Sequence, residues 1–273
     1  MKIARIGALG SEKPVVVEGD QAIDVSSLVS DWNRTELENG GYEKVAKADL
    51  SKLARTPLAG LRYGSPVARP TKVICVGLNY IAHIAETGAD TPKEPVIFMK
   101  PDTAILPKKT PFVIPEFSND VHHEVEVLVK ICKVGKYISP KFAHKYYDEI
   151  GLGIDFTARD LQAECKAKGL PWELAKAFDQ SAVVSSQWLP ITPKEFDSLS
   201  FEFHQNSVLK QHGNPTMMLF NIDQIIAYIS KFITLKTGDL IFTGTPAGVG
   251  PIAIGDELVG TLNGKEMYRI SVK

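Results

Sequence analysis

The stretch Val121-His-His-Glu-Val-Glu-Val-Leu-Val-Lys-Ile131 decides how this chain folds and what it can bind. Apolar and polar residues alternate along it and valine is frequent, which predicts a β-strand. Side chains two positions apart on a strand point to the same face, so Glu124 and Glu126 are expected to face one place. A Glu-x-Glu pair alone also fits the solvated face of an edge strand, so the neighbouring segments have to decide between the two readings.

A third carboxylate follows at Asp155, in the apolar, glycine-containing segment Gly151-Leu-Gly-Ile-Asp-Phe-Thr157. Three carboxylates with no cysteine nearby make a hard, all-oxygen site, which suits Mg²⁺ or Mn²⁺ and is unlike a structural zinc site. His122 shares the face of the glutamates and could be a fourth ligand on geometry alone. A hydrogen-bonding or packing role is the more common one for such a histidine.

A candidate general base lies in Asn79-Tyr-Ile-Ala-His-Ile-Ala-Glu86, which is compatible with a short helix. His83 and Glu86 are three residues apart, so on a helix they share a side and can touch. A carboxylate that orients an imidazole makes it an effective base for activating water. The alternative is an ordinary surface pair with no catalytic role.

Donor groups follow Asp155 in the sequence at Gln162 and Lys176. Apolar residues flank Lys176, so it could be partly buried with its ammonium facing the carboxylates, where it would stabilise a developing oxyanion. The alternative is a surface lysine whose stem alone is covered. The ion pairs that Arg159 and Asp160 could form are expected to be structural.

The segment Thr243-Gly-Thr-Pro-Ala-Gly-Val-Gly-Pro251 is a glycine- and proline-rich loop after an apolar strand. Such loops let backbone N–H groups approach an anionic ligand. The loop is not a Walker A motif, because no Gly-Lys-Ser/Thr follows, and its glycine spacing is not that of a dinucleotide site. A purely structural turn is the alternative.

Bulk properties set outer limits on function. With 273 residues, 44% of them hydrophobic, and a net charge of −1, the chain can bury a large core and gives no electrostatic reason to expect nucleic acid or a membrane as partner. No apolar run approaches the roughly 20 residues that span a bilayer, and the N-terminus lacks a signal-peptide core. Cys75, Cys132 and Cys165 have no metal or redox spacing and are expected to be reduced, mostly buried core residues of a cytoplasmic protein.

The pattern of elements predicts an α+β, strand-rich fold with two domains. Residues 1–70 contain short strand-like pieces, then polar and helical segments, then a proline- and glycine-rich linker over 56–70, so we expect a small N-terminal α/β domain. Residues 71–273 form the expected catalytic domain. Strands outnumber helices there without regular alternation, which argues against a doubly wound fold or an eight-stranded α/β barrel.

The expected elements of the second domain follow from local periodicity. Strands or extended segments are predicted over 72–77, 95–99, 112–114, 121–131, 150–156, 201–204, 208–210 and 240–242, and helices over 81–87, 140–149, 158–168 and 222–232.

Six segments, taken in order from Lys72 to the C-terminus, resemble the fumarylacetoacetate hydrolase family, most closely its acylpyruvase and oxaloacetate decarboxylase branch. They are Ile74–Tyr80 with His83, Glu94–Asp102, His122–Glu126, Asp155–Gln162, Lys168–Trp172 with Lys176, and Gly238–Gly250. The resemblance implies a mixed β-sheet roll, usually a homodimer, that acts on a small 2-oxo acid. One departure is Leu78, which stands where this branch usually has arginine.

The resemblance also implies roles for individual residues. Glu124, Glu126 and Asp155 would be the Mg²⁺ or Mn²⁺ ligands; His83 and Glu86 a water-activating dyad on a mobile lid; Gln162 and Lys176 catalytic groups near the substrate's oxygens; and Thr245, Gly244 and Arg159 the substrate-binding residues.

The activity implied is metal-dependent cleavage of a C–C bond in a 2,4-dioxo acid such as an acylpyruvate, or decarboxylation of oxaloacetate, through an enolate that the ion stabilises. The N-terminal 70 residues resemble the extra domain of longer bacterial members, which leaves open a hydrolase of sugar-derived diketo acids. An isomerase or hydratase of unsaturated 2-oxo diacids would share the metal site. A binding protein without turnover is the remaining alternative.

Overall fold

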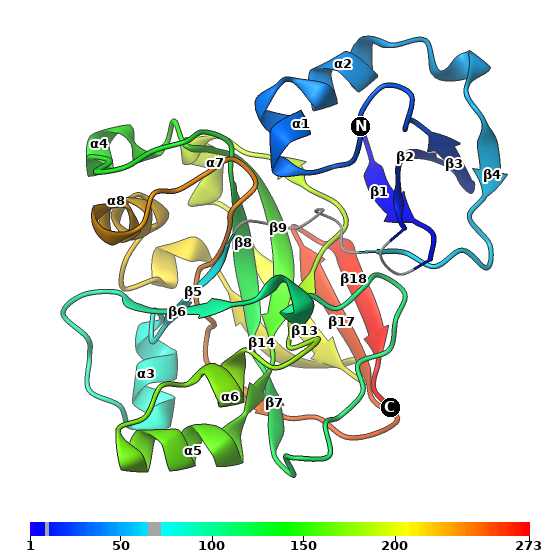
Figure 1. The fold of residues 1–273 in the computed structure, drawn as a ribbon. Coiled ribbons are helices and arrows are strands. Elements are labelled where there is room, and N and C mark those ends of the chain that lie inside the picture. Colours follow the sequence, from blue (N-terminus) through cyan, green and yellow to red (C-terminus); the bar gives the residue numbers. More distant parts are fainter. Residues whose placement is uncertain (9–10, 65–71) are drawn as a thin grey trace.

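A computed structural model describes residues 1–8, 11–64 and 72–273, and shows a mixed α+β, strand-rich fold as predicted (Figure 1). Its largest sheet has the strand order β11-β9-β8-β15-β5-β6, and β12 also pairs with β9. Only β15 and β5 run parallel, and all other neighbours are antiparallel. The strands are β5 (Val73–Gly77), β6 (Val96–Lys100), β8 (Val125–Ile131), β9 (Tyr147–Asp155), β11 (Ala182–Val184), β12 (Leu189–Pro190) and β15 (Leu240–Phe242).

Strand β8, the larger part of the stretch Val121–Ile131, lies at the centre of this sheet, and every residue of β8 is buried. Val125, Val127 and Val129 belong to the main hydrophobic core, whereas Leu128 packs in a separate cluster on the opposite face. The alternation read from the sequence is therefore confirmed, but the glutamate face is buried and not solvated. Both faces are covered because the sheet curls and a second sheet packs against it.

The predicted continuous strand over 121–131 is wrong in one respect: it is interrupted at Glu124. The first part, β7 (Val121–His123), leaves the main sheet and pairs with β10 (Thr157–Ala158) and β16 (Gly250–Pro251). Strand β8 begins after the break. The interruption arises because one run of chain serves two sheets, and it sets a glutamate at the junction between them.

A four-stranded antiparallel sheet of order β14-β13-β17-β18 closes the roll. Its strands are β13 (Phe201–Gln205), β14 (Val208–Gly213), β17 (Glu257–Leu262) and β18 (Lys265–Ser271). The strands predicted over 201–204 and 208–210 are confirmed and form a hairpin, whose turn residues Asn206 and Ser207 have φ of 53° and 65°, as a two-residue primed turn requires. Phe201 and Phe203 belong to the same core cluster as the β8 valines, so the main core lies between the two sheets.

Several helices match the periodicity of the sequence. α3 (Ile81–Thr87) and α8 (Ile222–Phe232) have the predicted bounds, and α5 (Arg159–Lys168) ends at Gly169, whose φ of 64° is left-handed. The others are α4 (Pro140–Ala143), α6 (Glu173–Lys176), α7 (Pro193–Phe196) and the 3-10 turns Asp102–Ala104 and Pro215–Met217.

The predicted helix over 140–149 is wrong beyond its first turn. α4 ends at Ala143, and Tyr147 already begins β9. Tyr147 opposes Ile131 of β8 and its ring meets that of Phe196 edge-on at 5.9 Å. Pairing with β8 and burial of this ring outweigh the local helical pattern.

The N-terminal residues form a separate sheet, which lies to one side of the main strands in Figure 1. Its order is β1 (Ile3–Ile6), β2 (Lys13–Glu18), β3 (Gln21–Asp24) and β4 (Arg55–Pro57), accompanied by α1 (Arg34–Glu38), α2 (Gly41–Lys47) and a 3-10 turn at Leu50–Lys52. It has its own small cores, such as the one around Val16 and Trp32. These features support the two-domain division that we propose, and the end of the expected linker, with the boundary at residue 70, falls in 65–71, outside the described residues.

Two further expectations concern membrane-spanning helices and thiols. Within the described ranges, no helix combines the length and apolar character that crossing a bilayer demands. All three cysteines are free; Cys75 and Cys165 are buried and Cys132 is partly exposed.

A basic cluster lies between the N-terminal sheet and the catalytic domain. The Nζ atoms of Lys108 and Lys109 lie 5.1 and 4.7 Å from the ring centre of Tyr63. Burial, together with the charges of Lys2 and Lys109, lowers the pKa of Lys108 from 10.5 to about 8. At neutral pH Lys108 is charged at an energetic cost.

We expect Lys108→Met to raise the melting temperature at pH 7 by about 2–4 °C. Folding lowers the pKa of Lys108, so the charged lysine reduces the free energy of unfolding. This loss of stability is complete below about pH 8 and disappears as pH rises toward 10.5. The gain in melting temperature should therefore shrink at pH 10. Thermal denaturation at both pH values, with the exposed Lys52→Met as control, tests this, and an equal gain at both pH values would contradict it.

Candidate metal centre

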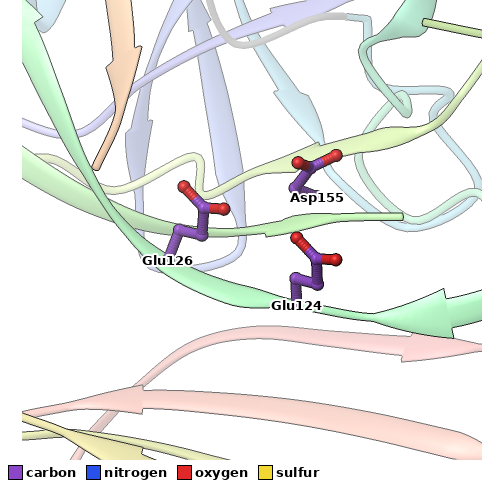
Figure 2. Close-up of side chains that lie close together, drawn as sticks. All are labelled: Glu124, Glu126 and Asp155. Atoms are coloured by element: carbon purple, nitrogen blue, oxygen red, sulfur yellow. The ribbon is translucent and has the colours of Figure 1, made fainter. Parts of the chain in front are cut away.

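Three buried carboxylates converge where β7, β8 and β9 meet. Glu124 occupies the break before β8, Glu126 lies on β8, and Asp155 ends β9. One carboxylate oxygen of each lies within 4.8 Å of those of the others, and Figure 2 shows the three side chains turned toward a common space. The backbone sets this convergence, because the N–H of Asp155 donates to the carbonyl of Glu124 at 2.8 Å.

Two lysines and an arginine balance part of this negative charge. The Nζ atom of Lys176 lies 2.8 Å from Oε2 of Glu124 and 2.7 Å from Oδ2 of Asp155. The Nζ atom of Lys100 lies 2.8 Å from Oδ1 of Asp155, as an ion pair without the alignment of a hydrogen bond. Arg159 forms an ion pair with Glu124.

The two glutamates differ sharply in protonation. Burial opposes ionisation of Glu124, but the charges of Lys176, Arg159 and His83 outweigh it and hold the pKa of Glu124 well below its usual range. Burial, then repulsion by Asp155 and Glu124, raises the pKa of Glu126 well above its usual range. Glu126 accepts a hydrogen bond from the N–H of Gly244 at 2.7 Å and has no cationic side chain as a partner among the described residues.

These groups fit a divalent metal ion. All three ligands are hard oxygen donors, they are nearly inaccessible to water, and Glu126 forms no ion pair with a cationic side chain of the described residues. Glu124, Glu126 and Asp155 would hold the ion, as the sequence predicts. His122 does not join them: its Nε2 lies 2.8 Å from Oδ1 of Asp120.

The predicted contact between the candidate base His83 and Glu86 is formed at the edge of this site. On α3, Nδ1 of His83 lies 3.2 Å from Oε2 of Glu86, and His83 is 5% exposed. Oε1 of Glu86 also accepts from the N–H of Gly248 at 3.0 Å. The pair is thus held against the glycine-rich loop, with His83 close enough to Glu124 to influence its pKa.

The glycine-rich loop over 243–250 lies along β8. The hydroxyls of Thr243 and Thr245 each donate to a β8 carbonyl at 2.9 Å, those of Val127 and Val125. Gly244 has a φ of +97°, and a Cβ there would come within 2.7 Å of the Cβ of Asn79. Only glycine permits this close approach, which brings the loop's N–H to Glu126.

The remaining predicted residues surround Glu124. Arg159 donates to Gln162 at 2.8 Å while pairing with Glu124, and the hydroxyl of Thr157 donates to the same glutamate at 2.9 Å. Arg159, predicted to contact substrate, is therefore engaged with protein groups in this structure. Lys176 is buried, as its apolar neighbours suggested.

Sequence reasoning missed two buried residues, Lys100 and Gln211. Lys100 ends the apolar strand β6, donates to the hydroxyl of Ser181 at 2.9 Å, and also binds the carbonyl of Lys176. A lysine closing an apolar strand just before Pro101 was the available signal. Gln211 carried none, since its hairpin strand has an ordinary mixed pattern.

Residues 72–270 match the Fumarylacetoacetate (FAA) hydrolase C-terminal family. The chain belongs to this family. The resemblance inferred from the sequence is thus confirmed, and the match begins one residue from the N-terminal end of the predicted catalytic domain.

Similar proteins include enzymes of related activities. Oxaloacetate tautomerase FAHD1, mitochondrial, of Mus musculus is 43% identical over 205 residues, which are 74% of this chain and 91% of that protein. The crystal structure of fumarylpyruvate hydrolase from Pseudomonas aeruginosa in complex with Mn²⁺ and pyruvate is 31% identical, covers 74% of this chain and 88% of that one, and has a TM-score of 0.69.

A third similar protein extends over the N-terminal domain as well. The crystal structure of 2-hydroxyhepta-2,4-diene-1,7-dioate isomerase from Mycobacterium marinum is 30% identical, covers 100% of this chain and 98% of that one, and has a TM-score of 0.74.

We expect Glu126→Gln to weaken Mn²⁺ binding by at least about 100-fold, because it removes one charged ligand of three while keeping the side-chain size. Titration calorimetry or Mn²⁺ paramagnetic resonance on the stripped protein measures this. Glu116→Gln, at an exposed position, is the matched control and should bind as the wild type does. Unchanged affinity in the Glu126 variant would contradict the assignment.

Proposed function

We propose that this protein is a divalent-metal-dependent enzyme that acts on small 2-oxo acids through their enolates, with keto–enol tautomerisation of oxaloacetate as its first activity. The observation that carries the proposal is the buried cluster of Glu124, Glu126 and Asp155 with Lys176 at its edge. The tautomerase that is 43% identical and the hydrolase solved with Mn²⁺ and pyruvate support the substrate class. Mg²⁺ and Mn²⁺ both fit the donor set.

The chain's own groups would handle charge and protons around a bound substrate. When bound, the ion would serve as a Lewis acid that stabilises negative charge on the 2-oxygen of the acid. Burial disfavours a charged Lys176, but Asp155 and Glu124 outweigh this and raise its pKa, so it stays an ammonium able to stabilise the same charge. His83 is the candidate acid–base group, which would take the proton from C3 when the enol forms and return it to C3 when the enol decays.

Hydrolysis of acylpyruvates is a second candidate, and the His83–Glu86 pair favours it. His83, oriented by Glu86, would take a proton from water as the oxygen attacks the distal carbonyl. The C–C bond then breaks, leaving a carboxylic acid and a pyruvate enolate that is protonated to pyruvate. Lys176 and Gln162 would stabilise developing charge.

Three other activities would use the same site. Decarboxylation of oxaloacetate leads to the same enolate without water. The N-terminal domain and the isomerase matched over the whole chain support a sugar-derived diketo acid or an unsaturated 2-oxo diacid as alternative substrates. A homodimer, a cytoplasmic location and a mobile α3 lid stay predictions.

The deciding experiment compares activities with and without metal. Protein stripped with a chelator is refilled with Mg²⁺ or Mn²⁺, and decay of the enol form of oxaloacetate is followed by absorbance while pyruvate release from oxaloacetate and acetylpyruvate is measured in parallel. We expect metal-restored tautomerisation well above the buffer rate. Refilled protein that accelerates none of the three reactions would overturn the proposal.

We expect His83→Ala to slow acetylpyruvate hydrolysis and oxaloacetate tautomerisation by about 100-fold or more, since both need its base, and to slow decarboxylation much less. Steady-state rates on the three reactions measure the pattern. His204→Ala, at a partly exposed histidine of β13, serves as control. Equal losses in all three reactions would refute the assigned base role.

A further inference from the structure

Gln211 of β14 is fully buried and joins three segments of the molecule. Its Oε1 accepts a hydrogen bond from the backbone N–H of Val125 at 3.0 Å and lies 2.9 Å from Nδ1 of His123. Its Nε2 donates to Oγ1 of Thr245 at 2.8 Å and to the carbonyl of Pro246 at 2.9 Å. One amide therefore ties the strand between the two glutamates to the glycine-rich loop.

The partners fix the orientation of this amide. The N–H of Val125 can only donate and the carbonyl of Pro246 can only accept, so Oε1 must face the first and Nε2 the second. Two donated and two accepted hydrogen bonds use the full capacity of the side chain. A flipped amide would mismatch the contacts with Val125 and Pro246 in a buried site, whereas the Thr245 hydroxyl and the His123 imidazole can each donate or accept.

This orientation also fixes the hydroxyl of Thr245. Because Nε2 of Gln211 donates to its oxygen, the hydroxyl hydrogen is directed to the carbonyl of Val125 at 2.9 Å. That hydrogen is not free for a substrate. Contacts between this loop and a substrate carboxylate then fall to main-chain N–H groups, whose positions depend on the loop being held still.

We propose that Gln211 is a positioning residue, which sets the glycine-rich loop at a fixed distance from the strand carrying Glu124 and Glu126. The inference rests on the proposed function. The loop is packed directly against β14, since a Cβ on Gly248 would come within 2.1 Å of the carbonyl of Lys210. The neighbouring strand residue Gln211 is thus the side chain best placed to hold it.

The same loop connects Gln211 to the candidate base. The N–H of Gly248 donates to Glu86, which in turn contacts His83. A loop that shifts after loss of the amide would carry this contact with it. Gln211 therefore acts on both the substrate-facing loop and the orientation of the base without touching the reacting atoms.

The test uses Gln211→Met, which keeps the side-chain length and removes all four hydrogen bonds. For Mn²⁺-loaded protein we expect the Kd of oxalate, and the KM for oxaloacetate, to rise about tenfold or more, because small displacements of binding groups are costly. Binding and KM within twofold of wild type would overturn the proposal.

A double-mutant cycle separates positioning from general damage. If Gln211 acts through Thr245, then adding Thr245→Val to Gln211→Met should change oxalate affinity by less than about threefold beyond the single variant. If the losses of oxalate affinity in the two single variants multiply in the double variant, Gln211 does not act through Thr245. Gln21→Met, on β3 of the N-terminal sheet and bonded to Asp20, is the control and should bind oxalate normally.

Hydrogen exchange gives a readout that needs no turnover. Gln211→Met should raise amide exchange over 243–250 and leave the N-terminal sheet unchanged; exchange that stays at wild-type levels in the loop would refute the proposal. Gln211→Asn, which is one methylene shorter, replaces the first variant if that one fails to fold. Wild-type protein that turns over no 2-oxo acid would defeat the proposed function alone, since exchange still reports on Gln211.

Discussion

The ion pairing of Lys176 with Glu124 and Asp155 is the interaction on which the rest of the structure depends. Burying an ion costs roughly several kcal/mol, so carboxylates this close together persist only with cations or strong donors around them. Lys100 and Arg159 share the task, and the N–H of Gly244 serves Glu126. All three cationic side chains pair with Glu124 or Asp155, so Glu126 is left without an ion-pair partner among the described residues, and a divalent ion would supply one.

The roll explains how a small set of strands can deliver these groups to one point. Strand β8 lies at the centre of the large sheet, β9 is its neighbour, and the glycine-rich loop follows β15 on its other side. Glu126, Asp155 and the loop amides therefore come from neighbouring strands, while the cationic side chains come from β6, α5 and α6. Helices α3 and α5 add groups from outside the sheet, and Figure 1 shows both on the same side of the molecule as α6.

The sequence predicted those features of the fold that depend on the local pattern of apolar and polar residues. The phase of β8, the bounds of α3 and α8, and the grouping of Glu124 with Glu126 follow from periodicity. The residue types suggested a metal site and a His83–Glu86 base, while the substrate-binding roles came from the family resemblance. The break at Glu124 and the early end of α4 depend on pairing with distant strands, which periodicity does not contain. Lys100 and Gln211 gain their significance only from partners that are at least 34 positions away along the chain.

The interruption at Glu124 has a mechanical consequence. Glu126 moves with the large sheet, whereas Glu124 sits where the chain passes into the sheet formed by β7, β10 and β16. The spacing of the carboxylates is therefore set by how far the roll is curled. Mg²⁺ demands a tighter and more regular shell than larger cations accept. A change in the curvature of the roll, through packing far from the carboxylates, would therefore alter their spacing and the size of ion that they fit, with the ligands themselves unchanged.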